Sequence, residues 1–407
     1  MDKKVKIGFA EFVGLMATLI ALTALSIDAM LPALTNIGSD LGVTVANDNQ
    51  LIISVLFLGL AIGQLFYGPL SDNIGRKPAL YLGLVFFGTG CLISLFSTSL
   101  TMMLVGRCIQ GIGLSGPRVV SVAIIRDLYK GERMAQVMSF VMAVFIAVPA
   151  LAPALGQGIL YIANWRMIFA ALLALGIVAL IWFSLRQHET LPKEKRLKFS
   201  VSNLGKALKE IVAIRSTVFY TLAAGFISSA FVGMLNSSQQ IFQIQFELGE
   251  RFPIYFAAIA LSIGAASFVN GKLVMRYGMQ NMVRIAVLAI VLISLVFFIL
   301  MSTIIMTPSL TIFMVYLLST VFFIGILFGN LNSMAMEPLG HMAGIGAAIV
   351  GSVSTFISVP FGTYIGMQYN GTVEPLAFGF LIFGTLTALA IFLAKGRNLF
   401  KFTKFHK

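Results

Sequence analysis

The sequence predicts an all-α polytopic membrane protein, with twelve transmembrane helices in two pseudo-symmetric six-helix halves. Three observations lead to this fold class. Hydrophobic residues make up 58% of the 407 residues and charged residues only 11%, which excludes a water-soluble domain of this length. The lysines and arginines gather in short segments between long apolar runs. A glycine-bearing turn also occurs twice, once in each half of the chain.

The apolar runs define the helices, because one membrane span needs about 20 apolar residues. From Ile285 to Met336 the chain carries no charged residue, and this stretch holds two helices separated near Pro308. On the same basis the expected spans are 9–34, 50–70, 79–98, 101–125, 134–161, 165–185, 216–240, 253–273, 285–305, 310–335, 344–367 and 375–394.

The repeated turn indicates that the chain contains an internal repeat, with one structural unit in each half. The first copy lies between the second and third expected spans, and the second copy follows 203 residues later. The second copy keeps the glycine spacing and lacks the acidic residue: Gly68, Asp72 and Gly75 are matched by Gly271, Met275 and Gly278. A polytopic membrane protein built from two similar halves is most often a transporter.

The lysines and arginines predict the orientation of the helices. With both termini in the cytoplasm, the inside loops and tails hold 24 of the 28, and the outside loops hold only Arg166 and Arg251. Short loops rich in these residues stay cytoplasmic. The net charge of +13 therefore reflects membrane orientation and contact with anionic lipid, and it does not indicate nucleic-acid binding.

The charge distribution also divides the chain. We expect an N-terminal half over residues 1–185, a cytoplasmic linker over 186–215, and a C-terminal half with a short basic tail over 216–407. The linker contains eight Lys or Arg residues and three Glu. This composition is typical of a solvated connector, with a short amphipathic piece around Leu204–Ile211.

Three charged side chains fall well inside expected helices: Asp28, Arg107 and Arg118. Each costs roughly 2.5–3.5 kcal/mol at the bilayer centre on insertion scales, so such residues usually face a cavity or a partner and mark function. Asp28 and Arg107 each lie six residues from the outer end of their helix, about 9 Å below the surface. They can meet where the first and fourth helices face each other.

Two interpretations of these charges remain open at the level of the sequence. In the first, Asp28 is a proton-titrating carboxylate whose charge switches when its access to solvent changes. In the second, Asp28 and Arg107 form a static pair that only orients two helices. Arg118 lies about three helical turns beyond Arg107. It either binds an anionic or acyl part of a substrate or satisfies neighbouring carbonyl groups.

Two other helices carry unusual residues. The fifth contains Pro149, Pro153 and Gly156, and small residues let neighbouring helix backbones approach closely. The seventh contains a dense run of uncharged polar residues that includes Asn236 and Gln239. Such groups are costly toward lipid, which predicts that they line water.

The residue types do not indicate an enzyme. The ionisable groups deep inside expected helices are one Asp and two Arg, and all three histidines fall in expected cytoplasmic segments. Both cysteines fall in spans, which favours neither a disulfide framework nor a zinc site. We therefore expect no catalytic residues, no metal and no cofactor.

The motifs resemble those of the major facilitator superfamily. The turn Gly68–Pro78 resembles its first cytoplasmic motif. The segment Arg107–Gly113 is similar to the arginine-bearing motif of its proton-coupled drug exporters. The segment Ala152–Gln157 is similar to its antiporter motif, with Ala and Gln where Gly is usual. Four further segments are similar to the Bcr/CflA branch of drug:proton antiporters: Ser26–Leu34, Arg126–Tyr129, Asn164–Arg166 and Met336–Pro338.

The resemblance implies two six-helix halves that rock around a central cavity. It also implies a cytoplasmic latch in the first half, with Arg126 as the salt-bridge partner of Asp72. The latch residues are Gly68, Asp72, Gly75, Arg76 and Arg126. The second half lacks both charges of the latch and has Met275 and Met279 in their place.

These features together predict proton-coupled efflux, by antiport, of small and largely apolar drug-like molecules across the inner membrane of a bacterium. The proton gradient is the expected energy source, and the expected proton-coupling residues are Asp28 and Arg107. The expected substrate contacts are Asp28, Arg118, Asn236 and Gln239. We expect a monomer whose partners are its substrate, protons and membrane lipid. The alternatives are a dedicated exporter of one endogenous metabolite, such as a siderophore, sugar or amino acid, and a non-transporting membrane receptor.

Overall fold

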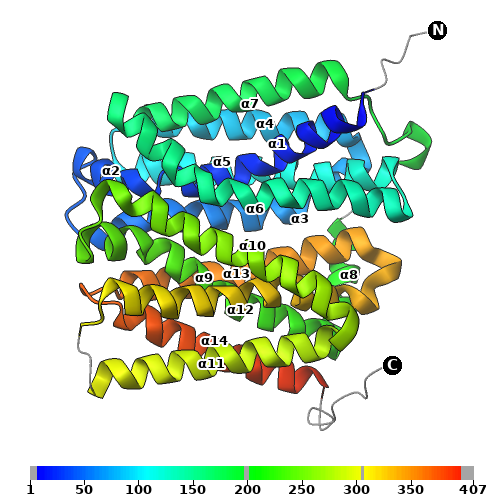
Figure 1. Cartoon of the computed structure of the whole chain (residues 1–407). Coiled ribbons are helices and arrows are strands. Elements are labelled where there is room, and N and C mark those ends of the chain that lie inside the picture. Colours follow the sequence, from blue (N-terminus) through cyan, green and yellow to red (C-terminus); the bar gives the residue numbers. More distant parts are fainter. Residues whose placement is uncertain (1–6, 197–200, 304–306, 396–407) are drawn as a thin grey trace. The chain divides into compact units, whose positions relative to one another are not determined.

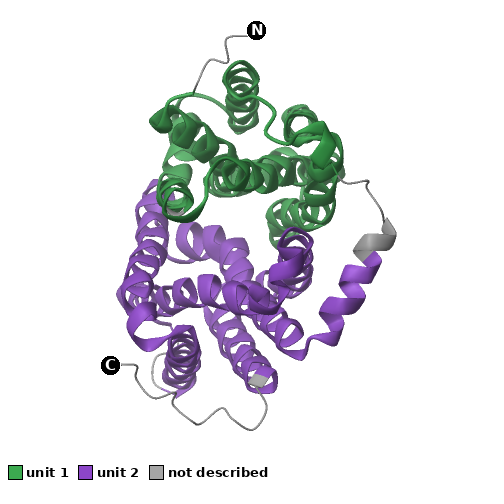
Figure 2. Ribbon diagram, turned by 90° about the vertical axis from the view of Figure 1, so that its right-hand side faces the viewer, with its two compact units in different colours: residues 1–201 green, residues 202–407 purple. Residues whose placement is uncertain are grey.

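The structure of the protein is a computed structural model that describes residues 7–196, 201–303 and 307–395. Within these ranges every regular element is a helix and no strand occurs (Figure 1). The chain divides into two compact units, residues 1–201 (unit 1) and residues 202–407 (unit 2), which Figure 2 colours separately. The division falls inside the segment 186–215, where the charge distribution predicts the linker.

Unit 1 contains the first group of spanning helices. They are α1 (Phe9–Asp28), α2 (Leu34–Asp40), α3 (Leu51–Ile74), α4 (Arg76–Leu95), α5 (Leu100–Leu128), α6 (Gly131–Ile162) and α7 (Arg166–Arg186). Short 3-10 turns connect or follow them: η1 (Leu31–Ala33), η2 (Ala46–Gln50) and η3 (Lys193–Lys195).

Unit 2 contains the linker helix and the second group of spanning helices. The α-helices are α8 (Val201–Ala213), α9 (Arg215–Gln239), α10 (Phe252–Tyr277), α11 (Met279–Thr303), α12 (Leu310–Met336), α13 (Ala343–Met367) and α14 (Glu374–Lys395). A π-helical turn, η4 (Gln240–Gln245), extends α9, and 3-10 turns form η5 (Gly249–Arg251) and η6 (Glu337–Met342).

The prediction of twelve transmembrane helices is confirmed. Over the described ranges, eleven helical stretches are long and apolar enough to cross a membrane. One of them, 310–367, is 58 residues long, whereas a single span needs only about 20. It consists of α12 and α13 joined by η6, and therefore supplies two spans. The first expected span is interrupted, because α1 ends at Asp28 and continues through η1 into α2.

The repeated glycine turn has the same role in both units. Gly75 has a φ of +107° and separates α3 from α4, and Gly278 has a φ of +77° and separates α10 from α11. These positive φ values strain any residue with a side chain, so glycine is favoured at both turns. The repeat noted in the sequence is thus a repeat of backbone geometry.

Helix α5 packs closely between α3 and α4 in unit 1. A Cβ atom at Gly59 of α3 would overlap the carbonyl oxygen of Cys108, and one at Gly90 of α4 would overlap the backbone of Gln110. Small residues of this kind let helices in a membrane approach and gain dispersion contacts. Helix α5 is therefore held tightly on two sides, and this fixes the positions of its arginines.

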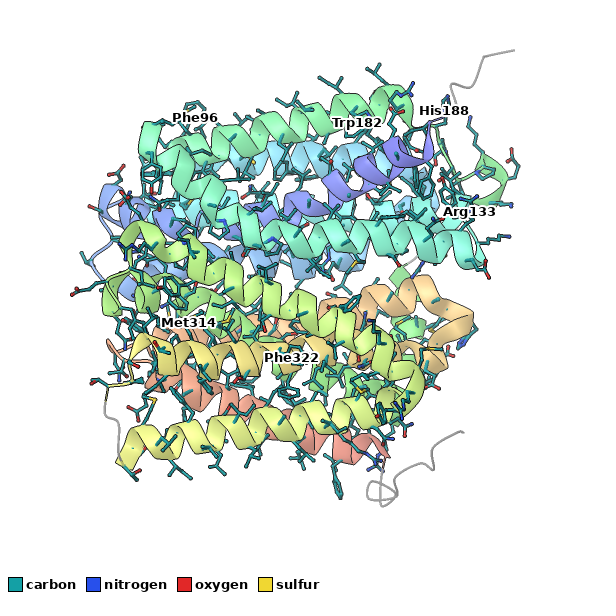
Figure 3. All side chains as sticks on the ribbon, in the orientation of Figure 1. Phe96, Arg133, Trp182, His188, Met314 and Phe322 are labelled. Atoms are coloured by element: carbon teal, nitrogen blue, oxygen red, sulfur yellow. The ribbon has the colours of Figure 1, made fainter. Side chains whose placement is uncertain are left out.

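Polar contacts hold the first spanning segment against α7 at both ends. Arg186 of α7 makes a bidentate pair with Glu11 of α1, with N···O distances of 2.5 and 2.6 Å. Trp182, labelled in Figure 3, donates to the same carboxylate at 3.3 Å. At the other end the indole of Trp165 donates to Asp40 of α2 at 2.8 Å. These bonds hold the two ends of the segment that is interrupted after Asp28.

The basic segments of unit 1 lie at one end of its helices. Figure 3 shows Arg133, in the first turns of α6, and His188, just after α7, at the same end of the unit. Phe96, which follows α4, lies at the opposite end. Helix α6 therefore begins, and α7 ends, at the same end of unit 1, so these two spans run in opposite directions.

Candidate functional site

Asp28 lies at the point where the first membrane-spanning segment breaks. It is the last residue of α1, and Pro32 in the following turn η1 has no N–H to donate to the Asp28 carbonyl. The residue is 5% exposed. Its carboxylate has neither a hydrogen bond nor an ion pair with any described residue. A buried carboxylate that nothing neutralises is costly as an anion, so it favours a bound proton or an incoming ligand.

Helix α6 passes the same break at a glycine. Gly156 is packed so closely that an added Cβ would overlap the carbonyl oxygen of Ala29, the residue after Asp28. Pro153 lies one turn before Gly156 and is also buried, whereas Pro149 is half-buried. The three residues expected from the antiporter-like segment thus lie on the helix that packs against the break.

We expect Gly156→Ala to destabilise the protein and slow transport, because the new methyl group must push α6 away from the Asp28 turn. Overpacking of this kind typically costs about 1–3 kcal/mol. Gly158→Ala is the matched control, since a Cβ at Gly158 of the same helix meets nothing within 4 Å. Thermal unfolding of the purified variants measures the difference. Equal melting temperatures for the two variants would contradict the close contact.

Arg107 is completely buried in unit 1 and connects three helices. Its Nε donates to the carbonyl of Ile52 in α3 at 3.0 Å, and one Nη donates to the carbonyl of Ser26 in α1 at 2.9 Å. The other Nη donates to the side chain of Gln110 at 2.6 Å. Among the described residues no carboxylate pairs with Arg107, so the Asp28–Arg107 pair considered from the sequence is absent from this structure. Two backbone carbonyls and the Gln110 side chain accept from Arg107 in place of a carboxylate.

Arg118 lies in a different environment from Arg107. Its side chain is exposed, and within the described ranges it has no hydrogen-bond or ion-pair partner. Pro117 immediately precedes it inside α5. The two arginines lie about three turns apart in α5, but Arg107 is buried and bonded to three acceptors, whereas Arg118 is exposed and has no bonded partner among the described residues. Of the two sequence interpretations of Arg118, the structure does not support neutralisation by neighbouring carbonyls.

The turn Gly68–Pro78 contains an ion-pair cluster centred on Arg76. The guanidinium of Arg76 bonds to Asp72 at 2.5 Å, to Asp127 at 2.9 Å and to the hydroxyl of Ser71 at 2.8 Å. The Ser71 hydroxyl itself donates to the carbonyl of Gly68 at 2.9 Å. The cluster therefore ties the α3–α4 turn to the end of α5.

The expected partner of Asp72 needs correction. Arg126 is exposed and makes no ion pair with Asp72 or with any other described residue. Its neighbour Asp127 faces the cluster and accepts from Arg76. Residues one apart on a helix point about 100° away from each other, so only one of the two can face the turn. In this structure Arg76 connects two aspartates.

Glu189 is a functional candidate that sequence reasoning missed. It follows α7, and its carboxylate accepts the backbone N–H groups of Arg76 and Lys77, each at 3.0 Å. These are first-turn donors of α4 that have no acceptor within the helix. The negative charge also lies at the positive end of the α4 dipole. An added Cβ at Gly75 would lie 2.6 Å from this carboxylate, so the glycine also leaves room for the contact.

We expect Glu189→Gln to lower stability by about 1 kcal/mol, because the helix terminus loses its counter-charge. Glu194→Gln is the matched control, since Glu194 lies in the same linker, is exposed and has no bonded partner among the described residues. Thermal unfolding in detergent is the measurement. The assignment fails if the control variant loses as much stability as Glu189→Gln.

In unit 2 the expected polar residues of α9 are buried. Asn236 donates to the carbonyl of Gly362 in α13 at 3.4 Å, and Gln239 donates to Gln243 at 2.9 Å. Ser229 and Ser237 donate to carbonyls one turn back in α9. Part of the polarity of this helix is therefore satisfied by its own backbone and by α13.

No metal site is visible in the described ranges. There, no group of three or more His, Cys, Asp or Glu side chains is placed to hold an ion. The charged groups described at the site are the buried carboxylate of Asp28, the buried guanidinium of Arg107, the exposed guanidinium of Arg118 and the Arg76 cluster.

Comparison with known proteins identifies the family. The model of the Major Facilitator Superfamily matches residues 16–363. The chain belongs to the major facilitator superfamily. It is thus a multi-pass membrane transporter of that superfamily, as the twelve helices and the glycine repeat predicted.

Several curated bacterial proteins are similar to this superfamily member along most of its length. The uncharacterized MFS-type transporter YdgK of Bacillus subtilis is 29% identical, with 96% of each chain covered. The bicyclomycin resistance protein homolog of Haemophilus influenzae is 26% identical over 95% of this chain and 97% of the relative. The multidrug resistance protein MdtL of Escherichia coli is 28% identical, with 82% of each chain covered.

Solved structures share the fold. The xylose transporter XylE of E. coli superposes with a TM-score of 0.69 at 16% identity, covering 96% of this chain and all of that one. The human organic anion transporter MFSD10 gives a TM-score of 0.67 at 20% identity, covering 96% and 100%. At these identities the likeness concerns the fold alone.

Proposed function

We propose that this transporter exports small, largely apolar, drug-like molecules in exchange for protons. One observation carries the proposal: Asp28 is a buried carboxylate with no bonded partner among the described residues, at a break in a membrane-spanning helix. Ionisable groups within spans usually mark ion or substrate pathways. The similarity to a bicyclomycin resistance protein homolog and to the multidrug resistance protein MdtL supports the class of substrate.

Asp28 is the proton carrier in the proposed cycle. In the inward-open state it is ionised, and substrate loads from the cytoplasm or the inner leaflet. After the halves rock to the outward-open state, Asp28 takes up a proton from outside and substrate leaves. Only the charge of Asp28 needs to change, because no cation among the described residues pairs with it. The protonated, empty carrier then returns to the inward-open state and releases the proton to the cytoplasm. Export is driven because proton and substrate exclude each other at Asp28, so each proton that moves inward is exchanged for substrate that moves outward.

The other site residues take different roles in this proposal. Arg107 holds α1 and α3 against α5, and so fixes the position of the Asp28 turn. Arg118 is charged, exposed and inside a spanning helix, so we place it toward water and substrate because lipid does not tolerate a bare guanidinium. Asn236 and Gln239 supply polar contacts from unit 2. The Arg76 cluster, with Glu189, forms the latch of unit 1.

We further propose that the protein lies in the inner membrane of a bacterium with both termini in the cytoplasm. The distribution of lysine and arginine supports this orientation. In this proposal the protein works as a monomer, needs no cofactor and uses the proton gradient alone.

The test is efflux from proteoliposomes that carry an imposed pH gradient. We expect several chemically unrelated lipophilic cations and neutral compounds to be transported against their concentration gradients. An ionophore that collapses the pH gradient should stop this transport. Transport of a single compound class would favour a dedicated metabolite exporter. Binding without any flux would favour a receptor, and flux that survives the ionophore would contradict proton coupling.

A further inference from the structure

The linker helix α8 has an apolar face that is only half covered. Ala207 and Ile211 are 7% and 5% exposed. Their neighbours Leu208 and Val212, each one residue further along, are 45% and 63% exposed. At 3.6 residues per turn these two pairs form adjoining edges of one apolar face. One edge is therefore buried in the protein, and the other is open.

Helix α8 lies at the level where the spanning helices of unit 2 end. Glu210 of α8 bonds to His341 at 2.7 Å, and His341 belongs to η6, the connection between α12 and α13. Figures 1 and 2 show α8 running across the direction of the spanning helices of unit 2. A helix in this position lies in the plane of the membrane surface and not through it.

The charges beside the open edge are basic and unpaired. Lys206 and Lys209 are exposed and have no bonded partner in the described part of the chain. The acidic residue of α8, Glu210, is already engaged by His341. Lys209 is the nearer of the two lysines to the open edge, because it lies three residues before Val212. The open face thus combines exposed apolar side chains with free positive charge.

We propose that α8 docks on the anionic surface of the membrane leaflet on its own side. Leu208 and Val212 insert between lipid headgroups, while Lys209 beside them reaches the lipid phosphates. An amphipathic helix with lysines beside its apolar face binds membranes by both forces together. Lipid lies close to α8 because the bilayer surface is near the ends of the spanning helices α12 and α13. This role is separate from export and does not depend on which molecule is carried.

Spin labels on opposite sides of α8 test the proposal. The native thiols Cys91 and Cys108 are first replaced by serine and alanine, and single cysteines are then introduced by Leu208→Cys or by Ala213→Cys, the control on the exposed polar side. The protein is placed in nanodiscs of phosphatidylcholine alone or with phosphatidylglycerol. Accessibility of each label to oxygen and to a water-soluble nickel complex is measured. Val212→Cys serves as a second probe if Leu208→Cys lowers the melting temperature.

With phosphatidylglycerol, we expect the label at 208 to be several-fold more accessible to oxygen than to nickel, and the label at 213 to show the reverse. Lys209→Gln, or discs without phosphatidylglycerol, should raise nickel access at 208. Equal nickel access at 208 and 213 would overturn the proposal, because α8 would then be solvated. Shielding of 208 from both reagents would mean that protein covers the edge. Shielding that is identical in both lipid mixtures would overturn the role of anionic lipid.

Discussion

Asp28→Asn is expected to abolish efflux driven by a pH gradient while leaving the protein folded and able to bind substrate. Asparagine keeps the shape of the side chain but cannot exchange a proton, so the energy of the gradient no longer reaches the substrate. Efflux from proteoliposomes should fall to the level of protein-free liposomes. Substrate affinity should also become independent of pH, whereas the affinity of the native protein should change with pH.

Asp48→Asn is the matched control for this experiment. Asp48 is the same residue type in the short turn η2, is half-buried, and its side chain has no bonded partner among the described residues. This variant should export like the native protein. Normal gradient-driven efflux by Asp28→Asn would show that protons couple elsewhere.

Arg107→Met is expected to destabilise the protein more than any other single change at the site. It leaves two backbone carbonyls and the Gln110 side chain without their donor, and each buried unpaired acceptor costs about 1–3 kcal/mol. The loss of a buried charge offsets part of this, so the net cost should be on the order of 3 kcal/mol. Thermal unfolding in detergent provides the measurement.

Arg107→Lys separates the charge from the geometry. Lysine keeps the positive charge, but its single ammonium lacks the planar fork that reaches three acceptors at once. Its stability should therefore lie between those of the native protein and Arg107→Met. Arg133→Met, at an exposed position, is the control and should change little. If Arg107→Met unfolds like the native protein but loses transport, Arg107 acts in proton coupling and is not a strut.

The fold could be predicted from the sequence because its main signals are local. Apolar runs of span length, glycines at 75 and 278, and the segregation of basic residues each report on their own segment. The twelve spans and the family follow from these signals. The sequence also predicted that Asp28 lies inside the first span. It did not predict that α1 ends at Asp28, because this depends on how the chain continues through Pro32.

The pairing of the charged residues could not be predicted, because it depends on the rotation of each helix and on contacts distant in sequence. Arg126 and Asp127 are adjacent, and only the packed structure decides that Asp127 faces Arg76. Glu189 lies 113 residues from Arg76, in a segment whose composition resembles any charged connector. Its one sequence signal is an acidic residue placed just after a span, where a neighbouring helix begins.

In the proposed cycle substrate and proton compete through Asp28. The most direct test of this competition is proton release from the purified protein in weakly buffered detergent solution, followed with a pH indicator while a transported compound is added. The native protein should release protons in proportion to the compound bound, and Asp28→Asn should bind the compound without releasing any. Equal proton release by the two proteins would contradict the account.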